Sequence, residues 1–506
     1  MSSKSLMHGG EESYCGVVPA KQPNKGEGSP AEAVEGRPQT KENTQEPNQC
    51  RTPSRGSGPS GLARVREAAS KDSKQKFTAL LHHVSMDLLR ESYHSLKKQA
   101  APGVDGMTWE EYGEDLEARL AGLHGRIHRG GYRAQPSRRV WIPKADGRQR
   151  PLGIAALEDK IVQYAVANVL NQIWEEDFLG FSYGFRPGRS QHDALDALWV
   201  GIMRKKVNWI IDLDIRSFFD KIQHEWLVKF VEHRIGDKRI VRLIQKWLKA
   251  GVMEQGQWSE TKEGSPQGAV ISPTLANLYL HYVLDVWAEA WRKKVAHGDV
   301  IMVRYADDAV LGFEHEHEAE CLLEQLRQRL QKFGLELHPD KTRLIEFGRF
   351  AAERRKQRGK SKPETFNFLG FTHICGTNHK TGNFALHRKT MSKRMAAKLK
   401  DIKAKLRVRM HHQIGGTVKW LQQVVRGYFQ YHAVPGNLQR MATFRREVTR
   451  LWYRTLRRRS QRSRLSWERF YERLGSQLPP IQVLHPYPNA RFDAKYPHIR
   501  GRNRVR

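Results

Sequence analysis

Three aspartates occupy positions where a carboxylate is costly unless something offsets its charge. Asp214 ends an apolar run that begins at Trp209, and Asp307 and Asp308 lie between two further apolar runs. Carboxylates beside buried strands cost several kcal/mol unless they are compensated, and a bound cation compensates them well. If these strands align in one sheet, the carboxylates can share Mg²⁺ ions, which prefer carboxylate oxygen and keep positions open for phosphates. The pattern therefore predicts a two-Mg²⁺ site that activates a hydroxyl and stabilises a leaving pyrophosphate.

Two ordinary explanations compete with this hypothesis. Asp favours turns, so the pair at 307–308 by itself also fits simple turn chemistry. The chain carries 87 Lys and Arg against 54 Asp and Glu, a formal net charge of +33, and such an excess calls for a polyanionic partner. Charge alone suits a scaffold that coats RNA as well as it suits an enzyme.

Composition excludes several other classes. The chain of 506 residues has no apolar run of about 18 residues, which argues against a spanning helix and favours nucleic acid over a membrane as the partner. No apolar leader opens the sequence, so we expect an intracellular protein. The cysteines lie far apart and support neither a disulfide framework nor a zinc site. They are Cys15, Cys50, Cys321 and Cys375.

The elements that must position the aspartates alternate irregularly between helix and strand, which predicts an α+β fold. The expected strands cover 208–215, 300–305 and 309–313, and a further hairpin covers 140–154 with its turn at 145–147. The expected helices cover 108–129, 161–173, 272–295 and 319–333. A Thr108–Glu111 capping box opens the first of them. Ser272 caps the third, which Pro273 starts, and Gly334 ends the fourth.

Composition also divides the chain into four parts. Residues 1–75 are rich in Gly, Pro, Ser and charged residues, which predicts a disordered tail. Residues 76–375 carry the strand patterns. Beyond 375 these patterns fade and basic helical stretches begin, so we expect a helical domain over 376–475 and a basic tail over 476–506.

Five segments, in order along the chain, resemble the sequence boxes of reverse transcriptases. Tyr305-Ala306-Asp307-Asp308 is similar to the catalytic box of that family, and Asp214 with Phe219 to its first metal-binding box. The other three segments are 264–273, similar to the box that supports template and nucleotide, 337–342, similar to the lysine-bearing box, and 368–371, similar to the primer grip. Five ordered matches outweigh the turn explanation.

Further segments narrow the resemblance to group II intron reverse transcriptase/maturases. These segments are 101–106, 142–153 and 183–190, and 420–431 is similar to the maturase, or X, domain. The resemblance covers about residues 89–464. It implies a right-hand polymerase with fingers and palm over 76–375 and an α-helical thumb/maturase domain over 376–475.

The resemblance implies a role for each matched side chain. Asp214 and Asp307 become the principal metal ligands, with Asp308 a third. Four residues are expected to bind the nucleotide: Lys144 and Arg150 at the triphosphate, Phe219 against the sugar to exclude a 2′-hydroxyl, and Gln267 under the templating pair. Lys341 is expected to protonate the leaving pyrophosphate. The expected primer grip consists of Phe368, Leu369 and Gly370. The ordinary alternatives are a solvated hairpin for 144–150 and a core position for Phe219.

The basic helical region is expected to bind RNA through Arg457, Arg458, Arg459 and Arg462, which have few acidic neighbours. We expect its aromatic residues mainly to pack between helices. No paired cysteines follow the region, so we expect no endonuclease domain, and a nick or primer must come from elsewhere.

These observations predict an RNA-directed DNA polymerase of a group II intron that also assists splicing as a maturase. Its expected partners are an RNA template, a DNA primer, the intron RNA and a DNA target, in the cytoplasm and, in a bacterium, at the nucleoid. The alternatives are an RNA-binding splicing chaperone with a relict polymerase, or a reverse transcriptase of the retron or phage-defence type.

Overall fold

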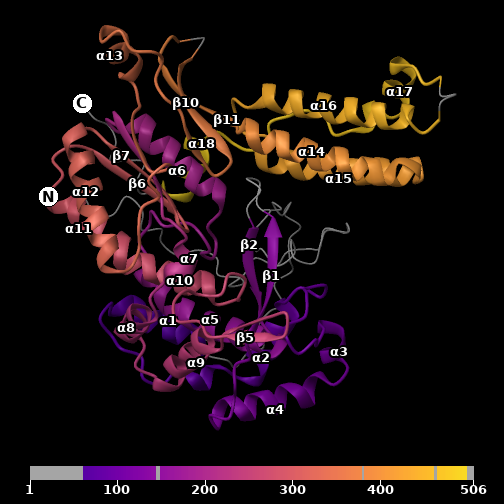
Figure 1. Cartoon of the computed structure of the whole chain (residues 1–506). Coiled ribbons are helices and arrows are strands. Elements are labelled where there is room, and N and C mark those ends of the chain that lie inside the picture. Colours follow the sequence, from indigo (N-terminus) through magenta and orange to yellow (C-terminus); the bar gives the residue numbers. More distant parts are fainter. Residues whose placement is uncertain (1–60, 144–148, 379–380, 461–463, 498–506) are drawn as a thin grey trace.

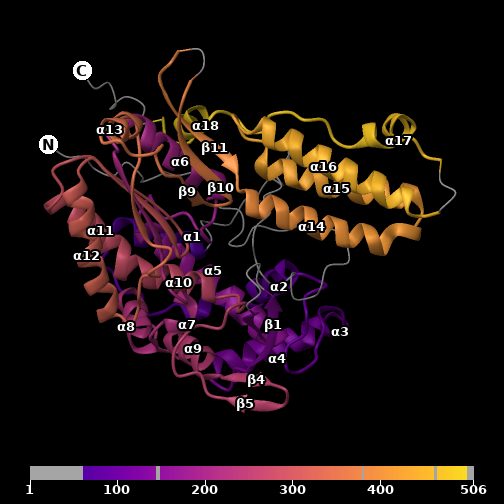
Figure 2. The same ribbon diagram turned by 45° about the horizontal axis from the view of Figure 1, so that its top comes forward.

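The computed structural model describes residues 61–143, 149–378, 381–460 and 464–497. Helices and strands are mixed, as predicted. Three sheets have the strand orders β6-β7-β3-β8, β2-β1-β4-β5 and β11-β10-β9. Figures 1 and 2 show that these sheets lie in one body of the protein, from which the helical segment α14–α16 projects to one side.

The sheet that carries the aspartates is antiparallel throughout. Its strands are β6 (Val300–Tyr305), β7 (Asp308–Phe313), β3 (Trp209–Asp214) and β8 (Arg343–Glu346). Ile211 and Leu213 face one hydrophobic core, and Ile210 faces another. The two faces are covered by α5 (Leu157–Asp177), α10 (Ser272–Leu280) and α12 (Glu316–Lys332) on the first side and by α6 (Gln191–Arg204) on the second. The predicted strands and the alternation of their faces are confirmed.

The second sheet contains the predicted hairpin. β1 (Ser137–Pro143) pairs with β2 (Gln149–Ile154), and β4 (Val252–Glu254) and β5 (Gln257–Ser259) extend the sheet. The turn predicted at 145–147 lies outside the described residues. The helices around α5 on this side are α2 (Met86–Ser95), α8 (His224–Arg234) and α9 (Lys238–Lys249).

Two predicted helices differ from the structure. The capping box at Thr108 is present, but its helix α3 (Trp109–Gly113) ends early and α4 (Leu116–His128) follows. Gly113 favours helix poorly, and Asp115 adopts φ −131° and ψ 49° between the two helices. The helix predicted over 272–295 is interrupted: a π-helical turn (His281–Asp285) separates α10 from α11 (Val286–Lys294).

The predicted cap at Ser272 is also wrong. Ser272 lies inside α10, and its hydroxyl donates to the Pro266 carbonyl at 2.9 Å instead of accepting from the helix. Ile271 is the residue that precedes the first turn. The Ser272 side chain therefore fixes the loop before the helix.

The predicted limits of the tails need correction as well. α1 (Gly61–Lys71) packs against α5 with Val65 and Ala69 buried, so the folded part begins before residue 75; residues 1–60 lie outside the described residues. At the other end, α18 (Pro488–Lys495) packs on α6 and buries Phe492. The segment predicted as a basic tail therefore folds back onto the body as far as residue 497.

Strands continue past the predicted boundary at 375, which falls inside β10 (Phe371–Thr377). β11 (Phe384–Thr390) pairs with β10, and β9 (Phe366–Phe368) completes the third sheet. β11 was missed because His387, Arg388 and Lys389 interrupt its apolar pattern. The helical segment therefore begins only at Ser392.

The projecting helices are α14 (Ser392–Val408), α15 (Ile414–His432) and α16 (Leu438–Arg457). They form a core of their own that buries Tyr428 and Trp452, so the expected packing role of these aromatic residues is confirmed. Short elements complete the described chain: α7 (Phe218–Lys221), α13 (Ala351–Gln357), α17 (Trp467–Arg473) and single 3₁₀ turns at Leu81–His83, Arg409–His411 and Gly475–Gln477. None of the described helices combines the length and apolar character needed to cross a bilayer.

Candidate active site

The strand register brings the three predicted aspartates to one edge of the sheet. In the β3–β7 ladder Asp214 lies opposite Asp308, and in the β6–β7 hairpin Tyr305 lies opposite Asp308. Asp307 therefore stands in the two-residue turn of that hairpin, directly beside the end of β3. Ala306, the other turn residue, has φ +57°, a left-handed conformation that is rare outside glycine.

The carboxylates repel one another. Desolvation, followed by the charges of Asp307 and Asp214, raises the pKa of Asp308 to about 7. Desolvation and Asp214 also raise the pKa of Asp307, whereas Arg150 and Lys341 oppose that shift. Asp212, on the same face of β3, has its pKa raised to about 6, first by desolvation. Such an edge favours a bound cation.

Asp214 has a cationic neighbour in the structure. Nζ of Lys341 lies 2.7 Å from Oδ2 of Asp214. The segment that carries Lys341 is fixed to the end of β3, because the His338 backbone N–H donates to the Asp214 carbonyl at 2.8 Å. Thr342 adds a hydroxyl contact of 3.3 Å to the Asp214 backbone N–H. The predicted lysine is thus beside the predicted metal ligand.

The donor set fits a hard divalent cation. Three carboxylates at adjoining register positions supply the oxygen ligands that Mg²⁺ prefers. Throughout the described ranges, no three His, Cys, Asp or Glu side chains stand close enough to form a ready ligand set; at this edge the carboxylates repel and Asp214 pairs with Lys341.

Two predicted nucleotide-binding residues are in direct contact. Nε of Arg150, on β2, donates to Oε1 of Gln267 at 2.5 Å, and the Gln267 amide lies 3.3 Å from Oδ1 of Asp220. The Gly153 backbone N–H donates to the Gln267 carbonyl at 2.7 Å. These contacts join the hairpin β1–β2 to the loop before α10. Lys144 lies outside the described residues.

Phe219 faces the same loop. It is half-buried, and its carbonyl accepts a hydrogen bond of 2.8 Å from the Ser265 backbone N–H. Its ring lies edge-on to Phe218, with ring centres 5.4 Å apart. Phe218 is buried, whereas Phe219 packs against the same hydrophobic core and remains partly exposed.

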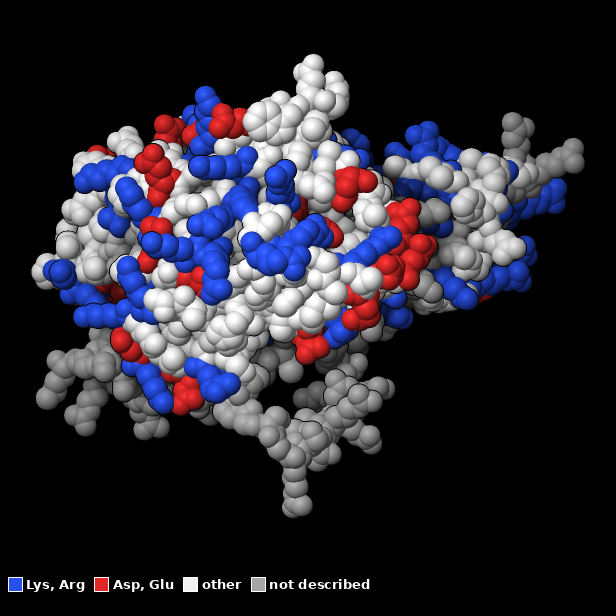
Figure 3. Space-filling model, turned by 90° about the horizontal axis from the view of Figure 1, so that it is seen from below, with Lys and Arg blue, Asp and Glu red and all other residues white. Residues whose placement is uncertain are grey.

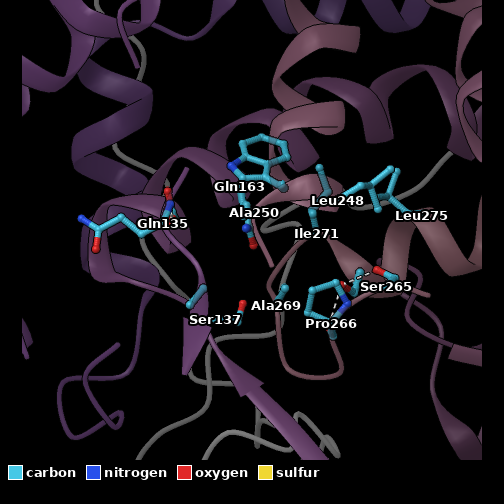
Figure 4. A pocket seen from close by; sticks show the side chains of 14 residues that line it. Gln135, Ser137, Gln163, Leu248, Ala250, Ser265, Pro266, Ala269, Ile271 and Leu275 are labelled. Carbon is cyan, nitrogen blue, oxygen red and sulfur yellow. Dashed lines mark hydrogen bonds between the residues drawn. The ribbon is translucent and has the colours of Figure 1, made fainter. Parts of the chain in front are cut away.

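A small pocket lies behind the loop that carries Gln267. Figure 4 shows Ser265, Pro266 and Ala269 on one side and Gln135 and Ser137 on the other. Asp159 also lines it, with its pKa raised to about 6, mainly by desolvation. Neither Arg150 nor Gln267 lines this pocket, so it is separate from their contact.

The predicted primer-grip residues form a tight hairpin turn between β9 and β10. Leu369 and Gly370 have φ of +46° and +84°, the combination that a two-residue turn of this hand needs. The Tyr431 hydroxyl donates to the Leu369 carbonyl at 2.6 Å, and the Met391 N–H to the Gly370 carbonyl at 3.1 Å. The turn is thus held by the residue that precedes α14 and by the last turn of α15.

Two basic residues near the site were missed by the sequence analysis. The positive charge of Arg394, on α14, partly opposes the rise in the pKa of Asp308. Arg304 is buried beside the catalytic turn and donates to the Ala306 carbonyl at 2.9 Å. The signal for Arg304 was present, because it is the one charged residue in the apolar run Val300–Tyr305.

The predicted RNA-binding arginines lie far along α16, away from the aspartates (Figure 1). Arg457 and Arg458 are exposed and Arg459 is half-buried, whereas Arg462 lies outside the described residues. Figure 3 shows Lys and Arg side chains over the face of the body and along the projecting segment. These arginines form a second candidate site, separate from the carboxylates.

Comparisons with known proteins agree with this geometry. Residues 142–373 match the family described as reverse transcriptase (RNA-dependent DNA polymerase). Protein YkfC of Escherichia coli (strain K12) is 37% identical over 49% of this chain and 74% of its own length. Group II intron-encoded protein LtrA of Lactococcus lactis subsp. cremoris is 29% identical over 57% of this chain. The putative COX1/OXI3 intron 1 protein of Saccharomyces cerevisiae is 33% identical over 40% of it.

The matched parts differ in extent between these relatives. The chain spans half the length of LtrA and 24% of the yeast protein. The matched family region contains all three aspartates and the predicted primer grip. The chain is similar to proteins encoded by introns, and it belongs to the reverse transcriptases, the RNA-dependent DNA polymerases.

Proposed function

We propose that this protein extends a DNA 3′-end with deoxynucleotides while it copies an RNA template, as the polymerase of a group II intron. The pairing of Asp214 with Asp308, beside Asp307 in the catalytic turn, carries this proposal. Asp214, Asp307 and Asp308 are the residues that would hold two Mg²⁺ ions. Such ions, when bound, supply Lewis-acid activation of a 3′-hydroxyl and neutralise the charge of a leaving pyrophosphate.

The chain's own residues bind and orient the substrates. Arg150 and Gln267 meet at the boundary between the hairpin β1–β2 and the loop before α10, where a guanidinium can contact triphosphate oxygens and an amide can support the templating pair. Lys144 is the second triphosphate contact of this proposal. Phe219, which is partly exposed beside Phe218, would exclude a 2′-hydroxyl by steric contact.

The projecting helices serve as the thumb, and the turn at Leu369 and Gly370 positions the primer end. This turn is hydrogen-bonded to Met391 and Tyr431 at the base of α14 and α15, so movement of the helices is coupled to the primer position. In this arrangement the body supplies fingers and palm, and the whole chain has the right-hand form of its family.

The decisive test is primer extension on an RNA template with dNTPs and Mg²⁺. Asp307→Ala is expected to abolish extension, because it removes a ligand and leaves the strand pairing intact. Glu320→Ala, an exposed change on α12, is the matched control and should extend normally. Extension by neither the native chain nor the control, with RNA binding retained, would favour a splicing chaperone with a relict polymerase.

We further propose that the outer end of the projecting helices binds the intron RNA and assists splicing. Arg457 and Arg458 are exposed there, and a small pocket nearby is lined by Arg409, Arg459 and Trp452. A cationic rim of this kind suits an RNA phosphate.

A splicing assay tests this second function. The native chain should accelerate splicing of the intron RNA that lies beside its gene, and Asp307→Ala should do so equally well, because the two sites are separate. A chain that extends primers but neither binds nor splices a neighbouring ribozyme would instead fit a reverse transcriptase of the retron or defence type. With these substrates the protein acts in the cytoplasm and, in a bacterium, at the nucleoid.

A further inference from the structure

A single buried guanidinium links the catalytic turn to three other segments of the chain. Arg304, in β6, has an exposed fraction of 1%. It donates to both carboxylate oxygens of Asp285, at 2.7 and 2.5 Å, and to the Ser182 hydroxyl at 2.7 Å. It also donates to Oδ1 of Asn277 at 3.2 Å and to the Ala306 carbonyl at 2.9 Å.

These five contacts use every N–H of the guanidinium, which has five. The side-chain partners are as buried as Arg304 itself: Ser182 and Asp285 are 0% exposed and Asn277 is 1% exposed. Charge-assisted bonds of this kind are strong and geometrically specific. The Ala306 carbonyl belongs to the peptide group that leads into Asp307, so the network fixes the orientation of that peptide.

The surrounding backbone is as tightly constrained. The Tyr183 N–H donates to the Arg304 carbonyl at 2.8 Å, and the Asn277 amide donates to the Gly184 carbonyl at 2.6 Å. A Cβ atom on Gly184 would lie 2.2 Å from the Ala306 backbone nitrogen, so only glycine allows this approach. The loop at 182–184 therefore packs directly against the catalytic turn.

The π-helical turn aligns two of the acceptors. Val286 donates its backbone N–H to the His281 carbonyl, five residues back, which adds one residue to the turn. Asn277 and Asp285 are eight positions apart. In an ordinary α-helix the directions of two such side chains around the helix axis differ by about 80°. Because the π-helical turn accommodates one extra residue, the angle between the directions of these two side chains falls to about 20°. Both side chains then reach the same guanidinium.

We propose that Arg304 is a positioning residue for metal binding: with Asp285, Asn277 and Ser182 it holds the Ala306–Asp307 peptide in the orientation that presents the Asp307 carboxylate to the cation. This inference rests on the proposed polymerase function. Arg304 touches neither substrate nor metal, and it acts through the left-handed turn residue Ala306. A buried ion pair whose only role is folding would leave the metal affinity unchanged.

The test measures metal binding and extension separately in the full chain. Arg304→Lys keeps the positive charge but loses the five-donor fork. We expect it to weaken Mn²⁺ binding, followed by electron paramagnetic resonance, by about tenfold, a typical effect of groups that orient a metal ligand. The Mg²⁺ concentration for half-maximal extension should rise by a similar factor, with little change in the KM for dNTP at saturating Mg²⁺.

Arg388→Lys is the matched control. Arg388 is 3% exposed and pairs at 2.9 Å with Asp196, which is 1% exposed, far along the chain from the catalytic turn. It should lower the melting temperature much as Arg304→Lys does, but leave Mn²⁺ affinity unchanged. Equal loss of melting temperature in both variants, with unchanged Mn²⁺ affinity in both, would overturn the proposal.

A milder variant covers the case in which Arg304→Lys does not fold. Ser182→Ala removes one acceptor and leaves the charge pair, so we expect the same direction of change, about threefold in Mn²⁺ affinity. An unchanged affinity in Ser182→Ala would then reject the positioning role. A native chain that binds Mn²⁺ in this Arg304-dependent way but extends no primer would contradict the polymerase proposal and leave this one standing.

Discussion

Nε of Arg150 lies 2.5 Å from Oε1 of Gln267, which joins the hairpin β1–β2 to the loop before α10. The two residues are 117 positions apart in the sequence, and the family resemblance assigns both to nucleotide binding. Because each holds the other in place, their contributions to nucleotide binding cannot be independent. A double-mutant cycle measures this dependence directly.

We expect Arg150→Ala and Gln267→Ala each to raise the KM for dNTP, and the double variant to cost less than the sum of the two. Residues in direct contact typically couple by about 1 kcal/mol, roughly fivefold in KM. Steady-state extension on one RNA template gives all four values. Strictly additive effects would show that the contact carries no functional coupling.

The second prediction concerns Lys341. The sequence suggested a proton donor for pyrophosphate, whereas the structure places its ammonium 2.7 Å from Asp214. If neutralising Asp214 is its main role, Lys341→Arg should retain most extension and Lys341→Ala should lose it, since arginine keeps the charge. A general acid contributes about 10²- to 10⁴-fold, so an equal loss of that size in both variants would support proton donation instead. Extension rates of the native chain and both Lys341 variants, measured across pH 6–9, complete this comparison.

Phe219 gives a prediction about sugar selection. Phe219→Ala should increase the use of ribonucleotides relative to deoxynucleotides by roughly tenfold or more, because a steric barrier to the 2′-hydroxyl is removed. The ratio of kcat/KM for dCTP and CTP measures this. Phe218→Ala is the control: Phe218 is buried in the core, so it should lower stability and leave the ratio unchanged. Equal ratios in both variants would exclude the selective role.

Much of the site could be predicted because local chemistry determines it. The alternation of apolar residues in β3 set which face Asp214 occupies, and an Asp-Asp pair between two apolar runs marked the hairpin turn. Strand pairing then fixed Asp214 opposite Asp308. The Leu369–Gly370 turn was not predicted as a turn, although the glycine supplies one of its two positive φ angles.

The remainder depends on contacts between distant residues. Arg304 lies within an apolar run, and its partners Ser182 and Asp285 belong to other elements, so no pattern along the sequence connects them. The π-helical turn has no periodic signal of its own, and the helix around it was predicted as continuous. α18 was predicted as tail because its burial depends on α6, where Asp493 pairs with Arg204 at 2.7 Å.

The stability of the protein should decrease in acid because of Asp237. Burial alone would raise the pKa of Asp237, but hydrogen bonds from Arg239 and from the Leu80 and Leu81 backbone N–H groups outweigh it and lower the pKa to about 2. A carboxyl with a depressed pKa stabilises the fold above its ordinary pKa near 4 and loses that contribution as the pH falls towards 2. At neutral pH the contribution is about 2 kcal/mol.

Asp237→Asn should therefore lower the free energy of unfolding at pH 7 by about that amount, and the difference from the native chain should shrink as the pH falls from 4 to 2. Urea unfolding at several pH values measures both. Asp87→Asn, at a side chain that is 92% exposed, is the control and should have little effect. A pH-independent difference for Asp237→Asn would show that packing, not ionisation, stabilises this site.

The outer end of α16 gives the last prediction. Arg457, Arg458 and Arg459 lie together on the projecting helices, far from the carboxylates. Changing all three to Ala should weaken intron RNA binding and reduce the slope of log affinity against log salt by about 0.7 for each phosphate that the variant no longer binds. Primer extension on a short template should be unchanged, because the polymerase residues are untouched.

A second triple variant removes the same charge from the body: Lys293, Arg327 and Lys332, all exposed, become Ala. If net charge alone governs RNA binding, both triple variants will weaken it equally and the arginines of α16 form no site. We expect the variant on the body to retain most of its affinity for the intron RNA. In our proposal the RNA is held by a defined set of phosphate contacts at the end of α16, not by the overall charge.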